Sequence, residues 1–332
     1  MSKEIVVSGI RPTGYLHIGN YFGAIQNFVR MQDHYQCYFF VADLHSLTTH
    51  PDRADLKTQV LRVLAENIAS GLDPDKVALY VQSDVPEIPE LYLLLNMLAY
   101  KGELEKVPTF KEKVRQHPEN VNAGLLTYPS LMAADILIHR ALKVPVGKDQ
   151  EQHLEMTRNL AVRFNHRYGD LFPEPQAFNF TEHLVKINSL DGAGKMSKSQ
   201  HEMATLYLAD TDEQIRKKIM KAKTDAGPSA PNTPMPDYIE NLFTLMRLVS
   251  EADVTEHFVQ AYAACNIRYG DLKKQLAEDM IRFVAPIRER AAAIQADEHY
   301  LRNVMKNGAE KARESAAATI RLARERMGLH YY

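Results

Sequence analysis

Residues 5–20 read IVVSGIRPTGYLHIGN, an apolar run followed by a turn and the beginning of a helix. The run Ile5–Gly9 is typical of a short buried strand that ends at a glycine. Pro12-Thr13-Gly14 favours a tight turn. From Gly19 to about Gln32 the apolar residues recur with helical spacing. A strand that runs through a turn into a helix is typical of the first unit of a parallel α/β sheet.

The following segments repeat this alternation. Cys37–Val41 and Val77–Val81 read as two more apolar strands, and Asp55–Ser70 between them is an amphipathic helix. We predict further strands at Lys143–Val146 and Leu184–Leu190. Strands that alternate with helices indicate a parallel sheet with right-handed crossovers, so the predicted fold class is α/β with a Rossmann-type sheet. Ligands of such sheets bind beyond the carboxyl ends of the strands.

The carboxyl-terminal part of the chain has a different character. A proline-rich stretch at Thr224–Asp237 reads as a long loop, and nearly everything after it reads as helix, ending in Glu298–Met327. We therefore predict a catalytic domain at residues 1–200, with a helical insertion at about 89–142 and a lysine-rich loop near its end. An all-helical domain is predicted at 201–332.

The composition limits the class of protein. Of 332 residues, 45% are apolar and 25% charged, and the net charge of −2 excludes a uniformly basic surface for nucleic acid. Any contact with RNA must therefore come from local patches. Two cysteines, Cys37 and Cys265, provide neither a disulfide framework nor a metal motif. No signal peptide and no membrane-spanning run is recognised, so a reducing, cytoplasmic setting is expected.

Two short segments carry groups that can bind phosphate. One begins a helix, and the other carries two lysines. His17 precedes the helix that Gly19 and Asn20 open, where free N–H groups attract an anion. Lys195 and Lys198 flank Met196-Ser197 in a loop that glycines precede. Two such lysines can follow the charge that moves onto leaving pyrophosphate. Alone, the first segment is also compatible with a loop histidine and the second with a solvated basic loop. Together they indicate activation of a carboxylic acid by ATP.

Four further residues carry polar groups in an apolar setting or at a strand end. Asp135 lies within the apolar helix YPSLMAADIL, where a buried carboxylate requires a donor such as an indole N–H. Backbone amides or a buried water are alternative partners. Asp149 and Gln150 follow a predicted strand, and Asp149 can equally be a helix N-cap. His45 also follows a strand and can be structural.

Taken in order, these segments closely resemble the class I aminoacyl-tRNA synthetases, and within them the tryptophanyl subfamily of bacteria. The resemblance covers Ser8 to Ser199, and its motifs are PTGYLHIGNYFGA, ADLHSLT, SGLDPDK, QSDVPE, FKEK, YPSLMAADIL, VPVGKDQEQHLE, RFN and KMSKS. Tyrosyl enzymes share the architecture, whereas the MAAD helix and the VGxDQ segment favour tryptophan. Other nucleotidyltransferases with a HIGH-type motif, and a synthetase-like protein kept only for RNA binding or regulation, are alternative interpretations.

The resemblance implies a role for each matching position. The implied catalytic residues are His17, Lys113, Lys195 and Lys198. The implied ATP site consists of Arg11, Pro12, Thr13, Gly19, Asn20, Lys111, Gly147, Asp149, Met196 and Ser197. The implied tryptophan site consists of Val7, His45, Tyr128, Met132, Asp135, Val144, Val146 and Gln150. The resemblance also implies ATP as substrate, Mg²⁺ bound through the nucleotide with no metal ligands from the protein, L-tryptophan and tRNA(Trp) as partners, an anticodon-binding helical domain, a homodimer and no membrane association.

Some positions depart from the pattern of the relatives. Arg11 and Thr109 stand where glutamine is usual, Lys148 stands where glutamate is common, and Val7 replaces a larger residue. The lead-in Gly192–Gly194 is less basic than usual. These changes concern fine affinity and inhibitor sensitivity, not the reaction. In the last helix, Lys306, Lys311, Arg313, Arg321 and Arg324 form a basic face that can either touch tRNA phosphates or belong to a solvated helix with i,i+4 ion pairs.

Overall fold

The computed structural model describes residues 3–116, 118–147, 150–178, 185–197 and 201–331 of the chain. Its strands are β1 (Ile5–Ile10), β2 (Gln36–Val41), β3 (Ala78–Val81), β4 (Lys143–Val144) and β5 (Gln176–Ala177). The helices up to residue 168 are α1 (Ile18–Asn20), α2 (Gln26–Met31), α3 (Asp43–Ser46), α4 (Arg53–Ala69), α5 (Glu87–Asn96), α6 (Lys101–Leu104), α7 (Pro108–Gln116), α8 (Ala123–Leu137) and α9 (Glu151–Tyr168). Those after residue 200 are α10 (Asp212–Met220), α11 (Asp237–Val249), α12 (Ala252–Ala263), α13 (Tyr269–Ala296) and α14 (Glu298–Met327). Short 3-10 or π-helical segments are η1 (Tyr21–Ile25), η2 (Leu47–Thr49), η3 (Gln82–Asp84), η4 (Pro118–Asn120) and η6 (Glu202–Ala204).

The strands form one parallel sheet in the order β3-β2-β1-β4-β5. β1 pairs with β2 along its whole length, with Val7 opposite Tyr38, and with β4 through Val6 and Lys143. Val6, Val7 and Tyr38 are buried because helices cover both faces, which is why these strands read as continuous apolar runs. The predicted Rossmann-type α/β fold is confirmed. The strand order reverses between β1 and β4, the position at which such sheets bind ligands.

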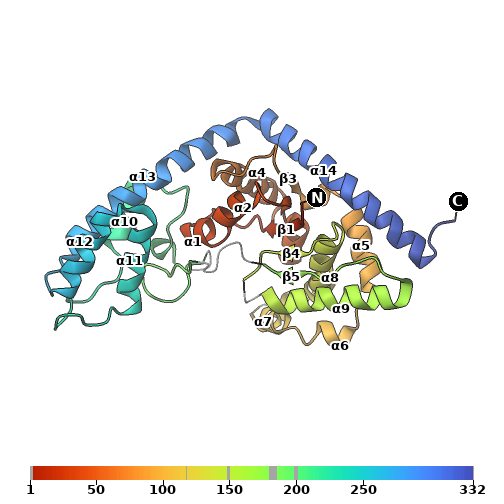
Figure 1. Ribbon diagram of the computed structural model, residues 1–332, viewed down its shortest axis with the longest axis horizontal. Helices are drawn as coiled ribbons and strands as arrows, with labels where there is room; N and C mark the ends of the chain where they lie inside the picture. Colours follow the sequence, from red (N-terminus) through yellow and green to blue (C-terminus); the bar gives the residue numbers. More distant parts are fainter. Residues whose placement is uncertain (1–2, 117, 148–149, 179–184, 198–200, 332) are drawn as a thin grey trace.

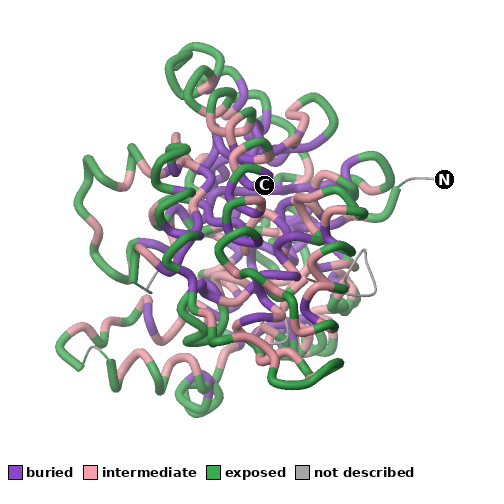
Figure 2. The backbone as a smooth tube through the Cα atoms, turned by 90° about the vertical axis from the view of Figure 1, so that its left-hand side faces the viewer, coloured by how far each residue is buried: buried purple, intermediate pink, exposed green. Residues whose placement is uncertain are grey.

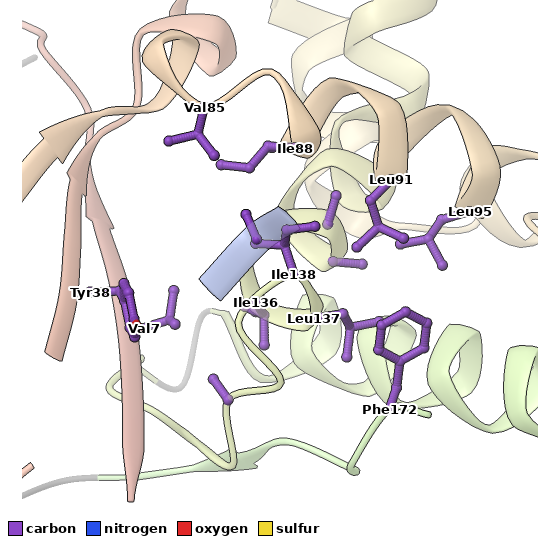
Figure 3. Close-up of a cluster of buried hydrophobic side chains, with 14 of the residues drawn as sticks. Val7, Tyr38, Val85, Ile88, Leu91, Leu95, Ile136, Leu137, Ile138 and Phe172 are labelled. Carbon is purple, nitrogen blue, oxygen red and sulfur yellow. The ribbon is translucent and has the colours of Figure 1, made fainter. Parts of the chain in front are cut away.

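Two apolar layers enclose the sheet. On one face, helices α5 and α8 pack over Val7, and Figure 3 shows Leu91 of α5 and Leu137 of α8 within this layer. On the other face, Leu64 of α4 packs with Phe39. Helix α8 therefore has one side in the core, and this burial determines which of its polar residues face the ligand edge of the sheet.

The beginning of the first helix belongs to a third apolar cluster. Leu16 and Ile18 are buried together with Met196 and with side chains of α11 and α13 such as Phe243 and Leu276. Figure 1 shows α1 on the side of the molecule that carries α10, α11 and α12. The segment around His17 is thus packed against residues from both halves of the chain. The domain boundary near residue 200 stays a prediction.

Helices α13 and α14 form a long arch across the molecule (Figure 1). α13 contacts α10 and α4, and α14 contacts β3 and α5. Gly308 marks the close approach of α14 to the strand, since a Cβ atom there would lie 1.9 Å from the carbonyl oxygen of Leu79. In Figure 2 the buried segments gather in the interior and the exposed turns lie outside. The arch connects the helical half of the chain to the edge of the sheet.

Several residues of the basic face predicted for the last helix form bonds to other groups of the protein. Lys311 Nζ donates to the carbonyl oxygens of Pro74, Asp75 and Val77 at 2.9, 3.2 and 3.3 Å. Arg313 Nε donates to the carbonyl of Asp84, and Arg324 Nε bonds the carboxylate of Glu90 at 2.5 Å. Arg321 pairs with Glu325, as the i,i+4 alternative predicts. Lys311, Arg313 and Arg324 therefore fasten α14 to the neighbouring loops and to α5. The interpretation of this face as a phosphate-binding surface stays a prediction.

The strand predicted at Leu184–Leu190 is wrong for the residues of this segment that the structure describes. Leu184 lies outside the described residues, and residues 185–190 carry only an isolated bridge between Asn188 and Lys195. Ile187 and Leu190 are apolar because they are buried in the helical cluster, not in the sheet. The fifth strand is Gln176–Ala177, which is too short and too exposed to show a strand pattern. The other predicted strands and helices match the observed elements with small shifts at their ends.

A buried histidine lies between the sheet and α14. His139 is 1% exposed, stacks on Tyr38 with ring centroids 4.0 Å apart, and places its Nε2 3.0 Å from Tyr80 OH and its Nδ1 3.1 Å from Ser315 Oγ. Burial disfavours the charged imidazolium and lowers the pKa of His139 to about 3. Between that value and about 6.5, the usual histidine pKa, the unfolded chain binds one proton more than the folded chain.

We expect this difference to make stability fall on the acid side. The free energy of unfolding should decrease by about 1 kcal/mol per pH unit as the pH falls below about 6.5 on account of His139 alone. A His139→Gln variant should lose this contribution to the slope, although it is less stable at neutral pH. Urea unfolding of both proteins at pH 7, 6 and 5 measures the two slopes. Equal slopes would contradict the assignment.

Candidate active site

The carboxyl ends of the central strands place polar residues along one edge of the sheet. Arg11 follows β1, His45 lies in α3 directly after β2, and Gln82 follows β3. Arg11 Nη2 reaches the carbonyl oxygen of His45 at 3.5 Å, which joins the first two of these segments. Val146 and Gly147 follow β4 on the other side of the switch point. The predicted site residues at these strand ends therefore share one edge.

His17 caps the helix that begins at Ile18. Its Nδ1 accepts the backbone N–H of Asn20 at 3.2 Å, and the Asn20 side-chain oxygen accepts the backbone N–H of His17 at 3.1 Å. Because Nδ1 accepts, the proton of the neutral ring is on Nε2, which makes that nitrogen a hydrogen-bond donor. A Cβ on Gly19 would lie 3.0 Å from the His17 ring, so a side chain there would press on the ring. The local sequence thus fixes both the tautomer and the position of this histidine.

The tertiary structure brings the lysine loop next to this helix start. Ile18 N donates to Leu206 O and Leu208 N donates to Leu16 O, at 2.9 and 2.8 Å, so the segment after the loop pairs with the segment around His17. Met196 is 2% exposed and packs in the same apolar cluster as Leu16 and Ile18. Its neighbour Lys195 is exposed, and Ser197 O accepts a hydrogen bond from Thr205. The prediction for Lys198 concerns a residue outside the described ones.

The glycines before Lys195 have a conformational role. Gly192 and Gly194 have φ values of 76° and 130°, a region that side chains rarely adopt. Asp191 closes the turn by accepting from the Ser189 hydroxyl at 2.6 Å and from the Ala193 N–H at 3.0 Å. These bonds hold the pKa of Asp191 below its usual value. The Gly-Ala-Gly lead-in is thus required by a tight turn that presents Lys195.

Asp135 is the buried carboxylate at the ligand edge of α8. It is 1% exposed, with His45 Nε2 2.8 Å from one carboxylate oxygen and Gln82 Nε2 donating to the other at 2.7 Å. Burial raises the pKa of Asp135, and the hydrogen bond from His45 opposes that shift. Each carboxylate oxygen can accept two hydrogen bonds, so the group retains capacity for a further donor. The proposed indole acceptor therefore has two side chains that orient it.

Apolar residues of the predicted tryptophan site lie on α8 and in the strands and segment packed against it. Val7 and Val144 are buried at 1% and 2% exposure in the layer that includes α8, and Met132 and Val146 are partly buried against it. These side chains come from β1, β4, α8 and the segment after β4. A flat aromatic ring can be enclosed by such a wall while Asp135 meets its polar edge.

Tyr128 and Gln150 meet through a residue that the sequence analysis did not assign. His153 of α9 contacts the Tyr128 hydroxyl through Nε2 and lies 3.1 Å from Gln150 Oε1 through Nδ1. Gln82 was missed in the same way. Its position directly after a buried strand is the signal that could have identified it, because the carboxyl ends of parallel strands share one edge. His153 had no comparable signal, since it does not follow a strand and its contact with Tyr128 spans 25 positions of the chain.

Other residues of the predicted catalytic and ATP sites lie on α7 and in the turn after β1. Lys111 and Lys113 lie on α7, the first exposed and the second half-buried. Pro12 is buried and Thr13 is exposed in the turn after β1. The prediction for Asp149, like the departure at Lys148, falls outside the described residues. The roles of α7 and of the turn therefore stay predictions.

This geometry defines a class of protein. A parallel Rossmann-type sheet, a His-Ile-Gly-Asn helix start and a lysine loop held beside it are the arrangement of a class I aminoacyl-tRNA synthetase. Residues 2–285 match the family described as "tRNA synthetases class I (W and Y)". The chain belongs to this family, and its activity is that of an aminoacyl-tRNA ligase.

Individual relatives narrow the branch. The chain is 59% identical over 326 residues to the tryptophan–tRNA ligase of Porphyromonas gingivalis, covering 98% of this chain and 99% of that one. It is 42% identical to the tryptophan–tRNA ligase of Helicobacter pylori, covering 99% and 100%. Among solved structures, tryptophanyl-tRNA synthetase of Campylobacter jejuni complexed with ADP and tryptophan superimposes with a TM-score of 0.88 at 33% identity, covering 98% and 99%. Within its family the chain groups with the bacterial tryptophan–tRNA ligases.

Proposed function

We propose that this site activates L-tryptophan with ATP and transfers it to tRNA(Trp). The observation that carries the proposal is Asp135, a buried carboxylate in an apolar wall that bonds His45 and Gln82 at the carboxyl ends of β2 and β3. An indole N–H is a donor without acceptor capacity, so it requires such a partner. A tyrosine ring would bring a hydroxyl that both donates and accepts. The 59% identity to a tryptophan–tRNA ligase favours the same substrate.

The first reaction step joins the amino acid to the nucleotide. A carboxylate oxygen of tryptophan attacks the α-phosphorus of ATP, the bond to the β-phosphate bridge oxygen breaks, and pyrophosphate leaves with the negative charge. His17 Nε2 would donate to a phosphate oxygen, while Lys195 and Lys198 would neutralise the charge that moves onto pyrophosphate. The implied roles of Arg11, Pro12, Thr13, Gly19, Asn20, Lys111, Lys113, Gly147, Asp149, Met196 and Ser197 in holding ATP are part of the same proposal. The protein thus provides position and charge, not a covalent nucleophile.

Mg²⁺ would enter with the nucleotide. Among the described residues no group of three or more His, Cys, Asp or Glu side chains could hold a metal ion. Bound through the nucleotide, Mg²⁺ supplies neutralisation of phosphate charge. In the second step a ribose hydroxyl of the tRNA attacks the acyl carbon of the adenylate, and AMP leaves.

Several properties of the whole protein belong to this proposal. Residues 201–332 would bind the anticodon, and the catalytic domain would end near residue 200. Two copies would pair through an exposed apolar face in which Leu93, Met97 and Tyr100 follow one another in and after α5, at 54%, 66% and 62% exposure. Among the described residues no helix has the length and apolar character needed to cross a bilayer. The cytoplasm is the proposed compartment, and Cys37 and Cys265 are free thiols.

Isotope exchange between ATP and pyrophosphate tests the function directly. We expect exchange that depends on L-tryptophan and is at least 100-fold slower with L-tyrosine. The indole N–H only donates to Asp135, whereas a tyrosine hydroxyl would leave its acceptor lone pairs unpaired in the apolar wall. Transcribed tRNA(Trp) and tRNA(Tyr) then test the second step. Exchange driven by tyrosine would overturn the substrate. Binding of tRNA without exchange for any amino acid would revive the alternative of an RNA-binding relative without catalysis.

A further inference from the structure

A closed group of polar side chains joins three helices beside the proposed amino acid site. Thr109 is on α7, Tyr128 on α8 and His153 on α9, and Gln150 directly precedes α9. Thr109 Oγ1 contacts the Tyr128 hydroxyl and lies 3.0 Å from His153 Nε2. The rings of Tyr128 and His153 meet edge to face with centroids 5.1 Å apart. His153 is 2% exposed, so both of its ring nitrogens need partners within the protein.

The hydrogen bonds of this group determine which atoms carry protons. Gln150 Oε1 can only accept, so the His153 Nδ1 that lies 3.1 Å away must donate to it. In the neutral ring Nε2 is then unprotonated and accepts. The hydroxyls of Tyr128 and Thr109 are its neighbours, and a Tyr128 proton directed at Nε2 leaves the phenol oxygen to accept from Thr109 and from one more donor. The bond from His153 Nδ1 likewise fixes the orientation of the Gln150 side chain.

We infer that His153 is a positioning residue that turns the Tyr128 hydroxyl into an acceptor for the α-ammonium group of the amino acid and holds Gln150 in one orientation beside it. A cation with N–H donors and no acceptor is bound best where every facing atom accepts. Without His153, the Tyr128 hydroxyl and the Gln150 amide are free to rotate and present a donor to the substrate instead. Thr109 completes the group by donating its hydroxyl proton to the Tyr128 oxygen. This inference rests on the proposed function and adds the means by which the amino group is recognised.

Two ligands separate this role from a merely structural one. L-tryptophan carries the α-ammonium group, and indole-3-propionate has the same ring and carboxylate without it. Calorimetric titration of the full-length protein gives the affinity for each. In His153→Phe, which keeps the ring but loses both nitrogens, we expect the affinity for tryptophan to fall about tenfold, in line with the loss of oriented bonds to a charged group. The affinity for indole-3-propionate should stay within about twofold, because that ligand makes no bond to this pair.

A second variant and a matched control complete the test. Thr109→Val keeps the shape of the side chain and should lower the affinity for tryptophan about threefold, again with little effect on indole-3-propionate. If His153→Phe does not fold, this variant decides. Thr157→Val is the matched control, because it makes the same chemical change one turn after His153 on α9. Among the described residues the Thr157 hydroxyl bonds only the His153 carbonyl. This variant should leave both affinities unchanged. Equal losses for both ligands, or wild-type affinities in both variants, overturn the role of His153. Wild-type protein that binds indole-3-propionate but not tryptophan would instead overturn the proposed substrate.

Discussion

Asp135→Asn should raise the KM for tryptophan roughly 10- to 100-fold, since a hydrogen bond to a charged group contributes about 1.5–3 kcal/mol. The substitution keeps the shape of the side chain and removes its charge. His45 and Gln82 each donate to a different carboxylate oxygen of Asp135, so the new NH₂ group must face one of these two donors. The remaining oxygen is then a weaker and less well oriented acceptor for an indole N–H. The KM for ATP should stay within about twofold, because no bond to the nucleotide is removed.

Steady-state ATP–pyrophosphate exchange, with each substrate varied in turn, measures both constants. Asp279→Asn is the matched control. Asp279 is a buried carboxylate at 2% exposure whose hydrogen bonds from Gln275 and Arg282 lie within α13. This control should lose stability but keep its tryptophan KM. An unchanged tryptophan KM in Asp135→Asn would remove Asp135 from its proposed role.

Gly308→Ala should destabilise the protein by about 3 kcal/mol or more, at the upper end of the usual cost of overpacking. An added Cβ would lie 1.9 Å from the carbonyl oxygen of Leu79 and 2.5 Å from its carbonyl carbon. A backbone strand cannot rotate away as a flexible side chain can, so α14 would have to move off β3. The hydrogen bonds of Lys311 to the loop before β3, one turn further along the helix, would be weakened by the same movement.

Urea unfolding followed by circular dichroism measures this loss. Gly270→Ala is the control, since it makes the same change in the first turn of α13, where an added Cβ meets nothing within 4 Å. That variant should be neutral or more stable by up to about 1 kcal/mol, because alanine favours helix over glycine. Equal midpoints for the two variants would show that α14 is not held tightly against β3.

The sequence-based predictions succeeded where local chemistry carries the signal. Val6 and Val7 occur in an apolar run because both faces of the sheet are covered, and this run predicted β1 correctly. They failed for residues 185–190, because apolar residues buried among helices have the same appearance as a buried strand. The same limit applies to Lys311 and Arg313, where a regular basic face gave no indication that it bonds the carbonyl groups of distant loops.

For the candidate site, motifs and packing contributed differently. The segments around His17, Lys195 and Asp135 were recognised from the chain alone, because helix starts, glycine turns and isolated carboxylates have short-range signatures. Their convergence was not readable from those signatures. Leu206–Leu208 pairs with Leu16–Ile18 across nearly 190 positions, and this pairing holds the helix start beside the lysine loop.

The remaining contacts of the site depend on three-dimensional packing in the same way. Gln82 and His45 reach Asp135 only because β2, β3 and α8 end at one edge of the sheet. His153 reaches Tyr128 only because α9 packs on α8. Residue types and local periodicity are properties of neighbouring positions, so the chain alone determines the fold class and the reacting groups. Which donor faces which acceptor depends on distances between segments far apart along the chain, and only the packed structure decides it.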